Sequence, residues 1–137
     1  MAARRRRNSA QTKAHREFVS EAEEILERMR DELSELAEGA QQGAETDPEV
    51  VNRLFRSAHS LKGLSGMFGL EGMSDLAHHL EDVLDRLRMG RAVLDKQGLG
   101  LFDEAVNLIA DTLGGLGSAK GRASSEEAIA GLLSRID

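Results

Sequence analysis

Hydrophobic residues recur along most of the chain at spacings of three and four, the period that places them on one side of an α-helix. The first of these stripes consists of Phe18, Ala22, Ile25, Met29, Leu33 and Leu36. It predicts a helix over about residues 13–38. No segment sustains the alternation of apolar and polar residues that is typical of a half-buried strand, so the pattern favours helices throughout.

A second helix is predicted to begin at Asp47 and Pro48. An aspartate at the N-cap accepts hydrogen bonds from free backbone amides, and a proline at the first helical position already has the required φ angle. The helix should end near the glycines of residues 66–69. Its inward stripe consists of Val51, Leu54, Ala58, Leu61 and Ser65.

Similar stripes predict a third helix that stops at Gly90 and a fourth that begins near Leu99. Residues 114–125 are rich in glycine and serine, which predicts a mobile loop. Ser124 and Glu127 then have the spacing of a capping box at the start of a last helix. We therefore predict an all-α fold, an up-and-down four-helix bundle with an additional short C-terminal fifth helix.

Composition limits what else the chain could be. Its 137 residues suffice for one domain with a single core. The absence of cysteine excludes disulfides, thiolate metal sites and cysteine nucleophiles. No apolar run approaches the ~20 residues that span a bilayer, and no apolar segment follows the basic start. We therefore expect a cytoplasmic protein without membrane insertion.

Charge divides the chain unevenly. Residues 1–16 contain six Lys or Arg and no acidic residue, which leaves twelve basic and twenty-four acidic residues in the remainder, a net charge of about −12. We predict a basic flexible tail over residues 1–13 and one domain over residues 14–137. The acidic domain should repel nucleic acid, so no nucleic-acid partner is expected. Arg4–Arg7 are the only candidate contact for phosphate backbones, and they are interpreted as the solvated charges of a disordered tail.

Small residues surround a histidine, His59, in the middle of the second helix. Glycine costs a helix interior about 1 kcal/mol, so Gly63 in this helix needs another reason. Helical spacing places one set of residues on a face away from the inward stripe: Phe55, His59, Lys62, Gly63 and Gly66. His59 is therefore predicted to point to solvent with Lys62 beside it, as an imidazole that can enter a second protein's active site.

An exposed imidazole can attack phosphorus through one nitrogen if its other nitrogen keeps a proton and donates it to an acceptor. The third helix offers His78 and Glu81, three residues apart on a polar side, and an antiparallel neighbour could bring them to His59. A carboxylate is the natural acceptor, which favours Glu81. Lys62 would supply positive charge to a transferred phosphoryl group.

Three segments carry a more specific motif: Ala58-His59-Ser60-Leu61-Lys62-Gly63, Gly66-Met67-Phe68-Gly69 and Leu76-Ala77-His78-His79-Leu80-Glu81. Together they resemble the histidine phosphotransfer (HPt) domain of CheA-type chemotaxis histidine kinases, the domain that accepts the phosphoryl group. Residues 18–36 and the Asp47-Pro48 helix start are also similar, so the resemblance covers nearly the whole chain beyond residue 14.

The resemblance implies that His59 is phosphorylated on its outer nitrogen, that Glu81 binds the inner nitrogen, and that Lys62 and His78 complete the polar network. It implies two partners: a histidine kinase catalytic domain that holds ATP and Mg, and a response-regulator receiver domain whose aspartate takes the phosphoryl group. No cofactor or metal is expected in this domain itself, and the domain is expected to be monomeric.

Several alternatives remain open at the level of sequence. Nothing here resembles an ATP-binding domain, so the chain is either a piece of a longer kinase or a free-standing HPt protein of a multistep phosphorelay. A metal-binding bundle is the main rival of another class, although the inward Glu-x-x-His pairs of di-iron bundles are absent. A non-catalytic structural bundle would explain the stripes but not Gly63 and Gly66 beside His59.

Overall fold

The structure is a computed structural model that describes the backbone of residues 2–43, 45–91, 94–116 and 119–136, and the side chains of these residues except 2–12, 119, 122 and 123. These residues form five helices and no strand, which confirms the predicted all-α class. The helices are α1 (Ala2–Gln41), α2 (Pro48–Met67), α3 (Glu71–Arg88), α4 (Lys96–Gly114) and α5 (Ala119–Ile136).

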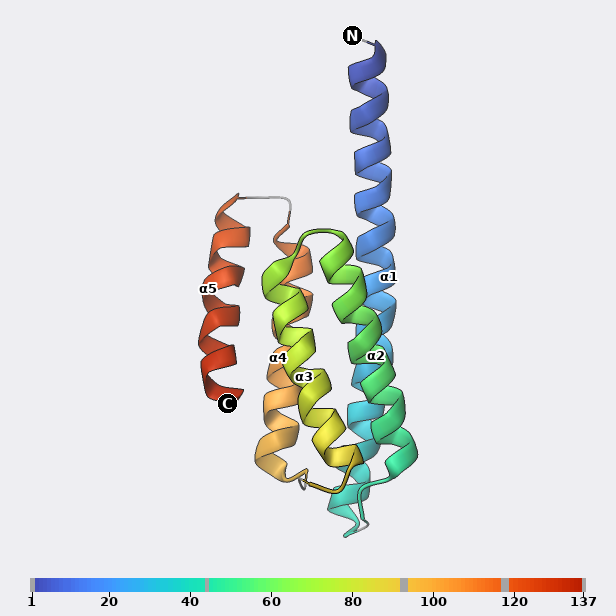
Figure 1. The fold of residues 1–137 in the computed structure, drawn as a ribbon, viewed down its shortest axis with the longest axis vertical. Helices are drawn as coiled ribbons and strands as arrows, with labels where there is room; N and C mark the ends of the chain where they lie inside the picture. The colour runs from blue at the N-terminus through green and yellow to red at the C-terminus, as the bar shows by residue number, and fades with distance from the viewer. Residues whose placement is uncertain (1, 44, 92–93, 117–118, 137) are drawn as a thin grey trace.

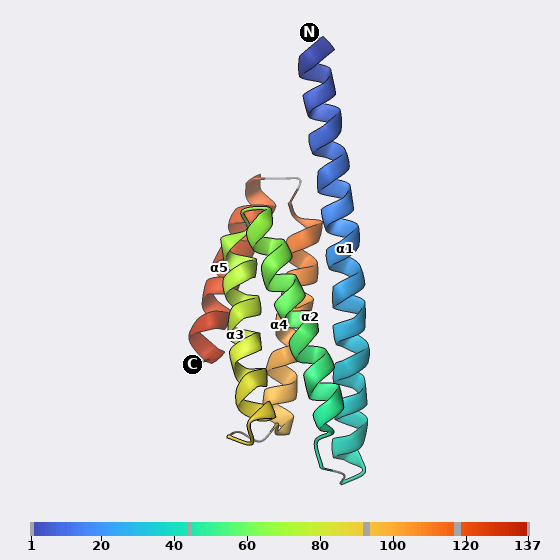
Figure 2. The same ribbon diagram turned by 45° about the vertical axis from the view of Figure 1, so that its right-hand side comes forward.

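Successive helices run in opposite directions, as Figure 1 shows. The first four helices form the bundle: α2 packs against α1 and α3, and α4 packs against α1 and α3. Helix α5 lies outside the bundle against α3 and α4, and the rotated view in Figure 2 shows the same arrangement. The predicted up-and-down bundle with a fifth helix is confirmed.

The core of the bundle is aliphatic, and it is made by the stripes that the sequence predicts. Leu54, Leu76 and Ile109 are among its fully buried members. Ser65 is also buried within the α2 stripe, where its hydroxyl donates to the Leu61 carbonyl at 2.7 Å. This bond satisfies the hydroxyl inside the helix, so a polar residue can occupy a core position without an unpaired group.

The helix ends explain how α2 and α3 come to lie side by side. The Asp47 carboxylate accepts a hydrogen bond from the Glu49 amide at 2.9 Å and begins α2 as predicted. Gly69 has a φ of +71°, a left-handed conformation that residues with a Cβ rarely adopt. The chain therefore reverses within a few residues, and α3 returns antiparallel along α2.

Helix α1 starts earlier than the hydrophobic stripe predicts. It begins at Ala2 rather than near residue 13 and projects beyond the bundle in Figure 1. The added segment contains alanine, arginine and glutamine, which favour helix, and it contains no glycine or proline. The division into a basic tail over residues 1–13 and a domain over residues 14–137 stays a prediction.

The expected loop over residues 114–125 and the capping box at Ser124 are wrong, because α5 already begins at Ala119 and is 18 residues long. The fifth helix is therefore not short. A Cβ added to Gly115 would lie 3.4 Å from the Cα of Gly121. These two glycines thus allow α4 and α5 to approach closely at their connection, which a glycine-rich composition alone does not distinguish from a mobile loop.

One carboxylate lies inside the bundle, between α1 and α2. Glu32 is 6% exposed, and its Oε1 accepts a hydrogen bond from the Ser57 hydroxyl at 3.0 Å. Burial raises the pKa of the Glu32 carboxyl, and this effect outweighs the opposing hydrogen bond and the charges of Arg53 and Arg28. The folded state therefore holds the Glu32 proton more tightly than the unfolded chain does.

Because the folded pKa of Glu32 is raised, this group favours folding below its unfolded pKa and loses that contribution as pH rises through the folded pKa. Ser57→Ala removes a hydrogen bond to the charged form, worth ~1.5–3 kcal/mol. We expect Ser57→Ala to lower the free energy of unfolding by about that amount at pH 7, and by less near pH 4.

Chemical denaturation at the two pH values measures this difference. The control is Ser60→Ala, an exposed serine on the same helix, which experiences the same change in helix propensity. A loss for Ser57→Ala that is equal at both pH values would contradict the role assigned to Glu32.

Candidate functional site

His59 lies on the outer face of α2, as predicted. Its side chain is 64% exposed, while its neighbours Ala58 and Leu61 are buried in the core. A Cβ added to Gly63, one turn further along α2, would meet no atom within 4 Å. Gly63 thus leaves open space beside the imidazole, so another protein could approach His59 closely.

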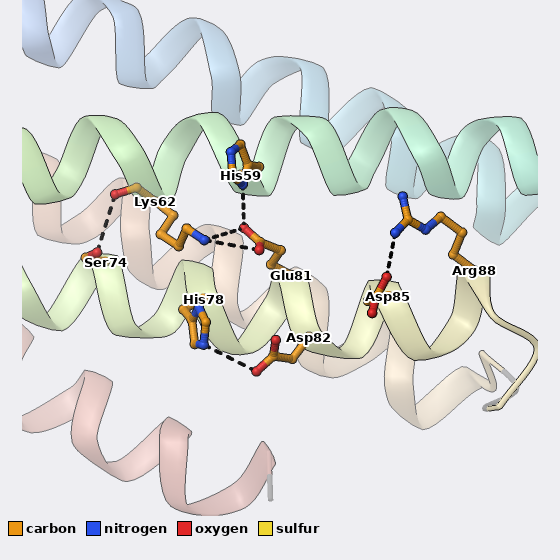
Figure 3. A network of polar contacts seen from close by, with 8 residues as sticks. All are labelled: His59, Lys62, Ser74, His78, Glu81, Asp82, Asp85 and Arg88. Carbon is orange, nitrogen blue, oxygen red and sulfur yellow. Dashed lines mark hydrogen bonds and ion pairs between the residues drawn. The ribbon is translucent and has the colours of Figure 1, made fainter.

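The antiparallel pairing of α2 and α3 brings Glu81 to His59 (Figure 3). The Oε2 atom of Glu81 lies 2.9 Å from Nδ1 of His59. The Glu81 side chain is only 14% exposed, in contrast to the histidine that it contacts. The inner nitrogen of His59 is therefore held by α3, and its Nε2 atom is left for an outside group.

Lys62 joins the same carboxylate. Its Nζ atom lies 3.1 Å from Oε1 and 3.0 Å from Oε2 of Glu81. The Lys62 side chain is 27% exposed, so it is less open to solvent than the face pattern suggested. Glu81 thus accepts from both residues of α2 at once, and the ion pair fixes the carboxylate against His59.

Partial burial alone would raise the pKa of the Glu81 carboxyl, but hydrogen bonds and positive charge from Lys62 and His59 hold this pKa below its ordinary value. Glu81 is therefore an ionised carboxylate at neutral pH and can only accept hydrogen bonds. It follows that Nδ1 of His59 carries the proton in the contact with Glu81. In the neutral imidazole, Nε2 then has a free electron pair.

His78 does not join this cluster in the way the resemblance implies. Its Nε2 atom lies 3.5 Å from Oδ2 of Asp82 on the same helix, and both side chains are more than half exposed. Figure 3 shows this pair below the contact between His59 and Glu81. Among the described contacts the structure therefore brings together three of the four predicted residues, His59, Lys62 and Glu81.

Two contacts around the cluster were not predicted. The Ser74 hydroxyl donates to the backbone carbonyl of Lys62 at 3.3 Å, and this bond ties the two helices together one turn beyond the site. Phe55, which the face pattern placed with His59, is half-buried against the core instead. Its ring is covered by the guanidinium of Arg88 from the end of α3.

The structure offers no support for the metal-binding alternative. In the part of the chain that it describes, no group of three or more histidine, aspartate or glutamate residues is arranged to hold a metal ion.

None of the described helices is long and apolar enough to cross a bilayer.

Comparison with known families identifies the domain. The family model described as "Hpt domain" matches residues 13–113. The chain belongs to the Hpt family. The match begins within α1 and ends within α4, and α5 lies outside it. The resemblance to histidine phosphotransfer domains is confirmed.

Relatives of this Hpt domain are chemotaxis proteins named CheA. The chain is 35% identical over 96 residues to CheA of Cereibacter sphaeroides. This alignment covers 70% of the chain and 14% of the relative. It is 37% identical over 93 residues to CheA of Halobacterium salinarum, covering 66% of this chain and 13% of the relative. CheA of Salmonella typhimurium is 33% identical over 96 residues, 70% of this chain and 14% of its own length.

The chain therefore aligns with about one seventh of each of these relatives. The similarity to CheA-type proteins confirms the predicted class of Hpt domain, a phosphotransfer domain of two-component signalling.

Proposed function

We propose that His59 accepts the γ-phosphoryl group of ATP from a separate CheA-type kinase domain and passes it to a receiver aspartate. One observation carries this proposal: the His59 side chain is 64% exposed, while its Nδ1 atom lies 2.9 Å from Oε2 of Glu81, whose side chain is only 14% exposed. A histidine with a fixed inner nitrogen and an open outer nitrogen is suited to nucleophilic attack outside its own domain.

In the first step, the electron pair on Nε2 of His59 attacks the γ-phosphorus of ATP. The Nε2–P bond forms, the bond from phosphorus to the β,γ-bridging oxygen breaks, and ADP leaves with that electron pair. Nδ1 keeps its proton, so the phosphorylated ring is cationic at nitrogen. Glu81 is placed to balance this positive charge, because its carboxylate already accepts the Nδ1 hydrogen bond.

In the second step, a carboxylate oxygen of the receiver aspartate attacks the same phosphorus. The new O–P bond forms, the Nε2–P bond breaks, and its electron pair returns to Nε2 of His59. The imidazole is then neutral in its original tautomer, still bonded to Glu81. No proton needs to be exchanged with solvent during the cycle, which suits a group that transfers phosphoryl between two proteins.

Lys62 has two tasks in this scheme. Its ammonium holds both oxygens of Glu81, which limits the rotation of the carboxylate under His59. It also places positive charge one turn from Nε2, where a phosphoryl group would carry negative charge. The ATP and Mg belong to the kinase domain, and the proposal includes a cytoplasmic location, where ATP and receiver domains meet this chain.

The test is incubation of the chain with a CheA-type kinase core and γ-labelled ATP. The expected product carries label that is lost in acid and survives alkali, which is the behaviour of phosphohistidine. Added receiver domain should then remove the label from this chain. A chain that takes no label from any CheA-type core, or takes alkali-labile label only, would contradict the proposal.

Gly63 supplies a separate prediction about access to His59. Gly63→Ala adds a methyl group that meets no atom within 4 Å, so we expect it to stabilise the helix by ~0.5–1 kcal/mol. We also expect slower phosphoryl transfer, because the methyl group fills the space that a partner's active site would enter. Thermal unfolding and the labelling rate measure the two effects.

Gly39→Ala is the matched control, since Gly39 is also a helical glycine with open space around it but lies on α1. It should stabilise the protein similarly and leave transfer unchanged. If Gly63→Ala is as active as Gly39→Ala, the glycine is not needed for partner access.

A further inference from the structure

An aromatic ring lies beside His59 on α2. The rings of Phe55 and His59 have centroids 6.5 Å apart and planes inclined by only 14°, an offset parallel arrangement of residues one turn apart. Phe55 is itself half-buried against the core, while His59 is mostly exposed. Phe55 thus lies between the exposed imidazole and the packed interior of the bundle.

A cation covers the same phenylalanine from α3. The Cζ atom of Arg88 lies 4.4 Å from the centroid of the Phe55 ring, within the range of a cation–π interaction. The Arg88 guanidinium is held in turn by Asp85, with Nη2 2.6 Å from Oδ1. Figure 3 shows Arg88 reaching from the end of α3 towards α2, next to this Asp85 contact.

These contacts complete what Glu81 does for His59. A single hydrogen bond at Nδ1 fixes one atom of the imidazole but leaves the ring free to tilt about that atom. The ring of Phe55 lies alongside the imidazole of His59 and restricts this tilt. Arg88, on α3, in turn restricts the movement of the Phe55 ring. Both effects act on the direction in which Nε2 points, and catalysis by positioning is sensitive to small changes in such a direction.

We propose that Arg88 is a positioning residue for phosphoryl transfer, acting on His59 through Phe55 and not through contact with a partner. This inference rests on the function proposed above for His59. Asp85 serves the same arrangement by holding the guanidinium over the ring.

The first measurement is the rate of His59 phosphorylation by a separate kinase core, with Arg88→Gln in the full chain. The Arg88 side chain is 40% exposed and outside the core, so the variant should fold. An exposed cation–π contact corresponds to a factor of ~2–5, and we expect kcat to fall by that factor with KM unchanged. Arg88→Lys, which keeps a cation over the ring, should recover most of the rate.

Arg86→Gln is the matched control, because Arg86 is an exposed arginine in the last turn of the same helix. It should leave both kcat and KM unchanged. A rise in KM for Arg88→Gln, or an equal effect of Arg86→Gln, would show that these arginines attract the kinase by charge, and the proposal would be overturned.

A double-mutant cycle tests whether Arg88 acts through Phe55. Phe55→Leu removes the aromatic face and keeps an apolar side chain, and it should itself lower kcat. In that background Arg88→Gln should have no additional effect, because the ring that it holds is gone. Additive effects of the two substitutions would overturn the proposal.

Ring orientation can be measured without any phosphoryl transfer. The three-bond couplings that report the χ1 angle of His59 by NMR should move towards rotamer averaging in Arg88→Gln and not in Arg86→Gln. Unchanged couplings would overturn the inference even if His59 takes label normally. If instead the wild-type chain takes no label on His59, the proposed function fails, and the couplings still decide whether Arg88 orders the imidazole.

Discussion

Replacing His59 with glutamine should abolish acceptance of the phosphoryl group and leave the bundle folded. The side chain lies 64% exposed outside the core, so its loss removes no core packing. Glutamine keeps a polar group near Glu81 but has no nucleophilic nitrogen. We expect His59→Gln to show no transferable label above background with a CheA-type kinase core, and a melting temperature close to that of the wild type.

Three other histidines could be labelled in place of His59. His15 lies on α1, and His78 and His79 lie on α3. The controls are therefore His15→Gln, His78→Gln and His79→Gln, which should take label at the wild-type rate. Acid-labile label that persists in His59→Gln would show that another histidine is the acceptor, and the site described here would be wrong.

Replacing Glu81 with glutamine should slow phosphorylation by ~10- to 100-fold, which is less than the ~100- to 10,000-fold typical of general acid–base catalysis, because Glu81 orients His59 and balances its charge without taking its proton. Glutamine keeps the size of the side chain and one acceptor oxygen, but it removes the negative charge that balances the cationic phosphorylated ring. Its amide NH2 can also donate a hydrogen bond to Nδ1, which favours the tautomer that has its proton on Nε2. Initial labelling rates at saturating kinase measure the effect.

Asp82→Asn is the matched control for Glu81→Gln. Asp82 is the next residue on α3, its side chain is 58% exposed, and it contacts His78 instead of His59. Asp82→Asn should leave the phosphorylation rate unchanged. KM for the kinase should be similar in Asp82→Asn and Glu81→Gln. A Glu81→Gln chain that is phosphorylated at the wild-type rate would mean that the carboxylate has no part in activating His59.

The relation between His59 and Glu81 could be predicted because it depends on two simple patterns. The apolar stripes determine which faces of α2 and α3 turn inward, and the short connection at Gly69 requires the two helices to be antiparallel. Together they leave few positions on α3 that can reach the exposed face of α2. A carboxylate at one of these positions was sufficient to name the partner.

The contact between Phe55 and Arg88 was not predicted, although the same register leads towards it. Phe55 lies one turn back along α2 from His59, and Arg88 lies two turns forward along α3 from Glu81, at the end of that helix. Helical spacing alone predicts Phe55 on the open face, because it assigns a direction but not the depth to which a large side chain folds back on the core. The contact of His78 with Asp82 was missed for a similar reason: a neighbour at i+4 competes with a partner across the helices.

The Gly and Ser content of residues 114–125 predicted a loop where α5 is already helical. Composition describes local preference, and here the close packing of Gly115 on Gly121 uses glycine for contact between helices. The burial of Glu32 was also not predicted, because its hydrogen-bond partner Ser57 lies on another helix, α2. The start of α5 and the burial of Glu32 thus depend on contacts between helices, which the periodic pattern of a single helix does not describe.

The central claim is that phosphoryl is carried on Nε2 of His59 while Nδ1 remains protonated and bonded to Glu81. The most direct measurement is an NMR spectrum of the phosphorylated protein labelled with ¹⁵N in histidine. We predict a coupling between phosphorus and the Nε2 atom of His59, with a proton retained on Nδ1. Phosphorus coupled to Nδ1 of His59, or to any nitrogen of another histidine, would contradict the account.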